Sequence, residues 1–231
     1  MNTRFSTRAA RTLAGAAVLL SFPLAALADP AAQGNPQAHT ADIRYFAAHV
    51  GMNKLANWPG EVNFGGPVVA ANLELSPGAN IGLIWGKQRE RARYEIEYQH
   101  GNIDIDRVTL GTRAAAVDAS GSYDVLTANA LHQRSYSQNG TVYAGLGVGI
   151  GRVKLPTIDI VPNCNCLSAN DKTGFVWQVR TGIEHRITAS GLVFGQIGYL
   201  KVPGPKSEDT AGASYRNRGF AVLSVGYRHQ Y

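Results

Sequence analysis

The sequence has few cysteines, few charged residues and no long apolar run in its main part. Two cysteines among 231 residues are too few for a small fold held together by several disulfides. Charged residues make up 16% of the chain, against about 25% in typical domains, whereas the hydrophobic share is an ordinary 45%. That share, together with 10 Tyr and 7 Phe, excludes an intrinsically disordered chain. Because no segment after residue 28 reaches about 18 consecutive apolar residues, the sequence also excludes a helical membrane protein.

The first 28 residues have the layout of a secretory signal peptide. Three arginines and no acidic residue lie within residues 1–11, residues 13–20 are apolar and rich in alanine, and residues 26–28 offer small side chains at a cleavage site. We expect residues 1–28 to be removed on export and residues 29–41 to form a flexible leader. The alternative for the apolar run is a buried hydrophobic helix. Without the three arginines the net charge falls from +6 to +3, and so small an excess on an exported chain gives no support for a nucleic-acid partner.

From residue 42 onward, many segments alternate between apolar side chains and polar side chains or glycine. A period of two places successive side chains on opposite faces, which indicates β-strands. In residues 142–151, for example, aliphatic residues occupy one face and mostly glycine occupies the other. The pattern predicts eight strands, at residues 43–52, 80–88, 92–98, 123–131, 142–151, 175–186, 192–202 and 223–231. The composition of residues 192–202 is typical of a strand but leaves open which face is apolar.

The segments between these strands alternate in length. Long segments lie at residues 53–79, 103–122, 153–173 and 203–218, whereas residues 87–91, 132–140 and 188–191 form short connections. This alternation is typical of bacterial outer-membrane barrels, which have short periplasmic turns and long external loops. The sequence therefore predicts an all-β fold over residues 42–231, an eight-stranded antiparallel up-and-down transmembrane β-barrel with four long external loops and three short periplasmic turns.

Alternation alone does not determine which face of the strands points outward. In a soluble lipocalin-like barrel the apolar face would line the interior, and this inverted arrangement is the alternative. An Arg or Lys on the lipid face would cost about 2–4 kcal/mol near the bilayer midplane, which favours charged side chains inside the barrel. We therefore expect an ion-pair network in the lumen, formed by Arg44, Arg93, Glu95, Glu97, Arg180, Glu184, Arg186 and Arg228.

The predicted network has two interpretations. An eight-stranded barrel is just wide enough for side chains to fill it, which favours a structural plug of ion pairs and hydrogen bonds. The alternative is an ion-lined path or gate. We expect Glu95 or Glu97 to pair with Arg180 or Arg228, so that removing one partner would cost roughly 3–5 kcal/mol of stability.

Aromatic residues lie near the ends of the predicted strands, on the apolar faces. Outer-membrane barrels carry girdles of aromatic residues at both membrane interfaces. The residues expected in such a girdle are Trp85, Tyr94, Tyr98, Phe175, Trp177, Tyr227 and Tyr231. Their placement favours an apolar face that is turned toward lipid.

An exported meander of strands ending in an aromatic residue resembles the small outer-membrane β-barrel proteins of Gram-negative bacteria, of the opacity-porin, surface-antigen and OmpA-transmembrane type. Residues 143–149 (YAGLGVG) and 126–130 (LTANA) are similar to middle strands of that superfamily. Residues 223–231 resemble the signal that the outer-membrane assembly machinery reads, although His229 stands where a more apolar residue is usual. The resemblance covers about residues 42–231. It implies location in the cell outer membrane, contact with outer-membrane lipid and lipopolysaccharide, and recognition of the strand ending at Tyr231 by that machinery.

Cys164 and Cys166 lie in the third long segment of a chain that we expect in an oxidising compartment. A disulfide between them would close a very small, strained ring. Three interpretations stay open: a bridge that stiffens the loop, a link to another molecule, and a metal site. Two thiols without a nearby histidine are a weak set of metal ligands, so we expect no metal and no cofactor.

Some small outer-membrane barrels are lipid A deacylases or acyltransferases, and those of the deacylase type present His-x-Ser on a strand. None of the six histidines in the sequence has serine two residues later, and Gly-x-Ser-x-Gly is absent. A lipid-modifying enzyme is therefore a minority alternative. We expect a structural or surface-interacting protein, acting in envelope integrity or in attachment to a surface ligand through its loops. A narrow pore for ions or very small solutes is the first alternative.

Overall fold

The fold is seen in a computed structural model that describes residues 42–159, 167–206 and 212–231. The predicted signal peptide, the leader at residues 29–41, Cys164 and Cys166 lie outside the described residues. The regular elements in the described ranges are β-strands, and no helix there is long and apolar enough to cross a membrane.

Eleven antiparallel strands form one sheet. They are β1 (Ile43–Leu55), β2 (Trp58–Asn63), β3 (Val68–Ser76), β4 (Gly78–Arg89), β5 (Ala92–Leu110), β6 (Arg113–Ser135), β7 (Gly140–Leu155), β8 (Asn170–Arg186), β9 (Gly191–Val202), β10 (Gly212–Tyr215) and β11 (Arg218–Gln230). β4 has 12 residues and β6 has 23, more than the roughly 9–11 that a tilted strand needs to cross a bilayer.

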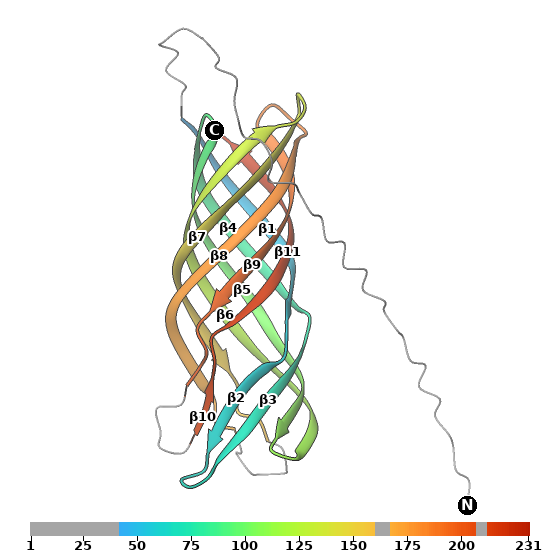
Figure 1. The fold of residues 1–231 in the computed structure, drawn as a ribbon. Coiled ribbons are helices and arrows are strands. Elements are labelled where there is room, and N and C mark those ends of the chain that lie inside the picture. The colour runs from blue at the N-terminus through green and yellow to red at the C-terminus, as the bar shows by residue number, and fades with distance from the viewer. Residues whose placement is uncertain (1–41, 160–166, 207–211) are drawn as a thin grey trace, which may run out of the picture. The chain divides into compact units, whose positions relative to one another are not determined.

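Eight of these strands form a closed ring. Along the hydrogen bonds the ring runs β5, β4, β1, β11, β9, β8, β7 and β6, and β6 pairs again with β5. The pairing of β1 with β11, from Tyr45 opposite Gln230 to Leu55 opposite Phe220, joins the two ends of the meander. Figure 1 shows the strands tilted around a common axis, with the short turns at the end where β11 finishes. The predicted eight-stranded antiparallel barrel is confirmed, and each ring strand corresponds to one of the eight predicted segments.

The remaining strands continue the sheet beyond the ring, at the end opposite the short turns (Figure 1). β2 and β3 form a hairpin, β3 pairs with the outer part of β5, and β10 pairs with β2. We call β2, β3, β10, residues 103–110 of β5 and residues 113–121 of β6 the extension. Residues 53–79 and 103–122, which the sequence predicts as long loops, are therefore largely strand.

A change of phase explains why the sequence pattern does not reveal the outer part of β5. The register shifts between Ile105 and Arg107, where a β-bulge displaces the alternation by one residue. Gly111, at a φ of 58°, then begins the two-residue connection to β6, a conformation that residues other than glycine rarely adopt. The hairpin of β5 and β6 thus continues well past the ring.

The inward face of the ring has two layers. Toward the short turns it is largely polar and charged, with a small apolar cluster of Tyr45, Ala47, Ile84 and Phe194, whereas toward the extension it is a continuous apolar core. In this core Leu55, Tyr123, Val125, Val153, Leu200 and Phe220 of the ring pack with Trp58, Val62, Leu73 and Tyr215 of the extension. The sequence predicts a lumen filled by polar and charged side chains, and the structure has that filling in one half only. The extension covers the other mouth, so apolar side chains there are shielded from water.

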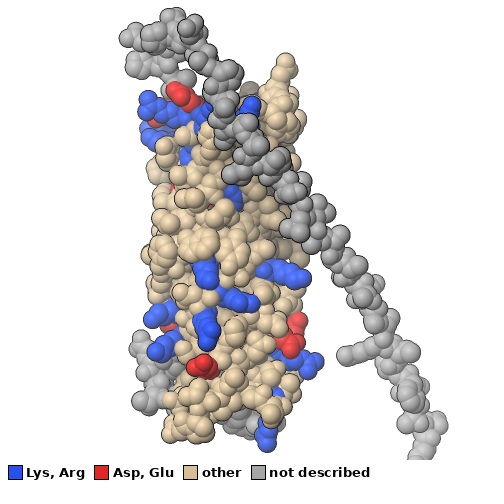
Figure 2. Space-filling model, in the orientation of Figure 1, with Lys and Arg blue, Asp and Glu red and all other residues tan. Residues whose placement is uncertain are grey.

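The outer face of the ring is apolar. Exposed aliphatic and aromatic side chains occupy alternate positions along the ring strands. β9 follows the same rule, because Val193 and Ile197 point outward while Leu192 and Leu200 point inward, which fixes the phase that the sequence leaves open. In Figure 2, charged side chains gather near the short-turn end and over the opposite half, with an almost uncharged band between them. The hydrocarbon region of a membrane requires such a band.

Candidate functional site in the barrel lumen

Six of the eight residues predicted for the lumen network meet in the polar layer. Arg93, Glu95 and Glu97 occupy alternate positions of β5, Arg180 and Glu184 lie on β8, and Arg228 lies on β11. The period of two points all six side chains inward, and each residue is at most 4% exposed. Three arginines thus face three glutamates, and the six charges cancel.

Glu97 is the centre of one half of the network. Its Oε2 accepts hydrogen bonds from Arg180 Nη1 at 2.8 Å and from Gln178 Nε2 at 2.7 Å. Asn129 Nδ2 also donates to Oε2 at 3.2 Å, and His49 Nε2 lies 3.0 Å from Oε1. Each oxygen of a carboxylate can accept more than one hydrogen bond, so these partners compensate for the loss of water around a buried charge.

Glu184 is the centre of the other half. Its two oxygens accept from Arg93 Nη1 at 3.2 Å and from Arg228 Nη2 at 2.6 Å. Glu95 joins the two halves, because it pairs with Arg93 at 3.2 Å and contacts Arg180 as well. The Tyr45 hydroxyl donates to Glu95 at 2.5 Å, and the Tyr45 ring lies under the guanidinium of Arg228 at 4.7 Å. The network therefore spans the lumen from β5 to β8 and β11.

Two of the predicted lumen residues lie elsewhere. Arg44 is exposed on the outer face of β1, because that strand turns Tyr45, Ala47 and His49 inward. Arg186 has the inward parity of Glu184 but lies at the end of β8, where its Nη1 donates to the carbonyl oxygen of Ala189 in the turn at 2.7 Å. Both positions correct the sequence-based assignment, because Arg44 has the outward parity of β1 and Arg186 lies beyond the layer that the inward face of β8 fills.

The layer also contains polar and aromatic side chains that are not among the residues predicted for the network. Tyr45, His49, Asn129 and Gln178 all lie at inward positions, and the period of two along each strand is the signal that could have found them. Gly147 makes room for one of them, because a Cβ at this position would collide with the side-chain oxygen of Asn129. Gly147 therefore contributes to the filling of the lumen.

Little space remains around the network. One cavity beside Gln99 and Gln178 and another beside Tyr45 and Phe194 have volumes of about 10 Å³ each. A volume of about 10–15 Å³ is needed to hold a single water molecule. In the described part of the chain, no group of three or more His, Cys, Asp or Glu side chains could hold a metal ion.

The seven aromatic residues expected in a girdle all point outward. They are Trp85, Tyr94, Tyr98, Phe175, Trp177, Tyr227 and Tyr231. Trp85 Nε1 donates to the Tyr231 hydroxyl at 3.2 Å near the short-turn end, whereas Trp177 packs against Tyr199 with ring centroids 5.6 Å apart. Amphipathic aromatic rings of this kind sit favourably at a membrane–water interface.

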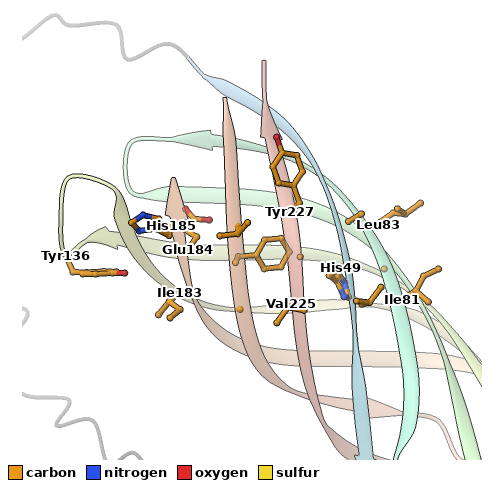
Figure 3. Close-up of a pocket in the computed structure, with 16 residues that line it drawn as sticks. His49, Ile81, Leu83, Tyr136, Ile183, Glu184, His185, Val225 and Tyr227 are labelled. Atoms are coloured by element: carbon orange, nitrogen blue, oxygen red, sulfur yellow. The ribbon is translucent and has the colours of Figure 1, made fainter. Parts of the chain in front are cut away.

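The outer wall is hollowed above part of the polar layer. A groove of about 770 Å³ crosses β4, β1, β11, β9 and β8 and has an almost entirely apolar lining. In Figure 3, Tyr136 lies at one rim and Ile81 and Leu83 lie at the opposite rim. Gly195 lines the groove and would place a Cβ in open space. The groove suits contact with hydrocarbon and offers few polar groups for chemistry.

No protein-family model matches the chain, and no curated protein matches it. Among solved structures, it is similar to the outer membrane protein OprG from Pseudomonas aeruginosa, with a TM-score of 0.60, 12% identity, and coverage of 85% of this chain and 99% of that one. It is also similar to Neisserial surface protein A, with a TM-score of 0.51, 14% identity, and coverage of 82% and 96%. Identities this low establish a fold and not an activity. With the closed ring and the apolar outer band, these similarities show that the chain has the fold of the small outer-membrane β-barrels.

Proposed function

We propose that the protein is a closed barrel of the bacterial outer membrane with a structural or surface-interacting role, in envelope integrity or attachment. The filling of the lumen carries this proposal. The ion-pair network occupies the half near the short turns, and the apolar core occupies the half near the extension. A solute would have to displace both layers to pass.

The charge balance of the network also favours a plug over a narrow pore. Channels that select ions through charged side chains use rings of one sign. Here each of the three arginines contacts at least one of the three glutamates, so the layer has no excess charge to attract an ion. An ion would also have to replace hydrogen bonds that the network already makes.

Conductance of the purified chain in planar lipid bilayers tests the closed lumen. We expect no channel openings under conditions in which a known porin, inserted in the same way, conducts. Steady single-channel conductance would support the pore and contradict the plug.

The extension supports the surface-interacting part of the proposal. It presents a hairpin tip beyond the ring, and Phe64 and Val68 at this tip are exposed. Neighbouring apolar side chains that are exposed together are typical of surfaces that contact another molecule. The proposal places the extension outside the cell, as expected for the long-loop end of such a barrel.

An epitope tag tests this orientation. Inserted between Gly65 and Gly66, where added atoms would meet open space, the tag should be reached by antibody on intact cells. A tag between Ser137 and Gln138, in the turn between β6 and β7, should be reached only after the outer membrane is permeabilised. The opposite pattern would contradict the proposed orientation.

The described residues do not support the enzyme alternative. Hydrogen bonds join His49 to Glu97 and His100 to Asp124, the pairs that could act as a base and its orienting acid. In the described ranges, neither histidine is hydrogen-bonded to a serine or cysteine that could act as a nucleophile. Mass spectra of lipid A from cells with and without the protein should therefore be the same.

A further inference from the structure

A second, smaller groove on the outer wall lies beside the short-turn end. It has a volume of about 400 Å³ and is lined on its outer side by Arg44, Trp85, Lys87, Tyr94, Ile96 and Ala128. These residues come from β1, β4, β5 and β6, and strand register joins them into one patch: Arg44 lies opposite Lys87, Lys87 opposite Tyr94, and Trp85 opposite Ile96. The groove thus has a cationic end and an aromatic and apolar floor.

The two cations face each other directly. Like charges in directly opposite positions of neighbouring strands destabilise a sheet, unless something neutralises them. Asp42 partly does so, with its Oδ2 3.6 Å from Lys87 Nζ, but both side chains are about half exposed. Arg44 forms no ion pair within the described residues. Two cationic side chains therefore stand beside one acidic side chain at the mouth of an apolar groove.

The location of the groove restricts what can fill it. An Arg on the lipid-facing side costs least near the membrane interface, and long Arg and Lys side chains there reach toward the head groups. Trp85 and Tyr94, on the floor below the cations, are residue types that lie at this level. A ligand that fits needs an anionic group at the interface and an apolar chain that runs from it into the hydrocarbon.

We propose that this groove is a binding site for an anionic phospholipid, whose phosphate lies between Arg44 and Lys87 and whose acyl chain lies against Trp85, Ile96 and Ala128. The inference rests on the proposed function, because it needs the barrel in a membrane with the short turns in the periplasm, where the facing leaflet is phospholipid. One Lys or Arg side chain near the membrane surface raises the association constant for an anionic lipid about fivefold over that for a zwitterionic lipid. With one of the two cations partly neutralised by Asp42, the site should prefer an anionic lipid over a zwitterionic one about fivefold.

Trp85 is a reporter within the site. The full chain carrying Trp177→Phe keeps Trp85 as its outward tryptophan, since Trp58 is completely buried. It is refolded into phosphatidylcholine vesicles that contain a small fraction of either dibrominated phosphatidylglycerol or dibrominated phosphatidylcholine. We expect brominated phosphatidylglycerol to quench Trp85 with an association constant about fivefold higher. Equal quenching by the two lipids would overturn the site.

Matched variants separate a site from general attraction to a cationic surface. Arg44→Gln with Lys87→Gln should abolish the preference, whereas Arg89→Gln with Arg134→Gln, which removes the same charge from the same end outside the groove, should keep it. Asp42→Asn should strengthen the preference, because it frees Lys87. Equal loss in both double variants, or no change in Asp42→Asn, would contradict the proposal.

Two further measurements test whether the barrel is in the bilayer and which class of lipid binds. Trp177, followed in a Trp85→Phe variant, should be quenched equally by both brominated lipids. If Trp177 is not quenched at all, the barrel is not in the bilayer and the proposed function fails with the site. If lipid A displaces brominated phosphatidylglycerol from Trp85 more effectively than unlabelled phosphatidylglycerol does, the assignment to phospholipid is overturned.

Discussion

Arg180 on β8 reaches across the lumen to Glu97 on β5, with its Nη1 2.8 Å from the carboxylate Oε2, and it contacts Glu95 on the same strand. The side chains of Arg180 and Glu97 are both almost fully buried. The pair therefore ties together two walls of the barrel that are not neighbours in the sheet. Removing one member of a buried ion pair leaves the other charge uncompensated. The resulting loss of stability is larger than the net stabilisation that the pair provides.

Glu97→Gln should lower the free energy of unfolding by roughly 3–5 kcal/mol, since it leaves Arg180 with less compensation. Urea unfolding of the chain in lipid vesicles measures the change. Glu74→Gln is the matched control, because Glu74 pairs with Arg107 at 3.5 Å on the exposed surface. The control should cost at most about 1 kcal/mol. An unchanged midpoint for Glu97→Gln would show that the network does not stabilise the barrel.

Trp58→Ala should detach the extension from the ring. Trp58 is completely buried in the apolar core, and its loss should cost about 3–5 kcal/mol. Hydrogen exchange should show β2, β3 and β10 losing protection while the ring strands keep theirs. Phe64→Ala, at the exposed hairpin tip, should change neither. Equal loss of protection in ring and extension would mean that the two unfold as one unit.

The hydroxyl of Tyr215 in the extension should ionise at an unusually high pH. Burial in the apolar core raises its pKa to about 12 from the ordinary value near 10. Absorbance of the wild-type chain minus that of Tyr215→Phe should therefore show one tyrosine that titrates near pH 12. Because the folded-state pKa is the higher one, this group stabilises the extension below pH 10, and the contribution is lost as the pH rises through about 12. A difference midpoint near 10 would place Tyr215 in water.

The barrel was predictable from the sequence because its signal is repeated. A period of two in eight segments fixes both the strands and the face of Glu97 and Arg180. The ring then brings together side chains 83 positions apart, which no local pattern contains. Which glutamate meets which arginine depends on register around the ring, so the sequence limits the partners and the structure selects them.

The sequence-based assignment is wrong at two positions, at one for the face of the strand and at the other for the height along the barrel. Arg44 lies on the outward face of β1, with the parity of Phe46 and Val50. Arg186 has the right parity but lies beyond the polar layer. The sequence does not predict the strands of the extension, because the bulge at Ile105 interrupts the period of two and prolines interrupt the first long segment.

A closed barrel in the outer membrane with its apolar face toward lipid underlies both the proposed function and the lipid site. Gel mobility of the outer-membrane fraction, unboiled and boiled in detergent, tests this most directly. A closed barrel keeps its hydrogen bonds in cold detergent, because it has no free edge from which to unfold. We expect the protein in that fraction, with an unboiled band that migrates differently from the boiled one. A soluble periplasmic protein with a single, unshifted band would contradict the account.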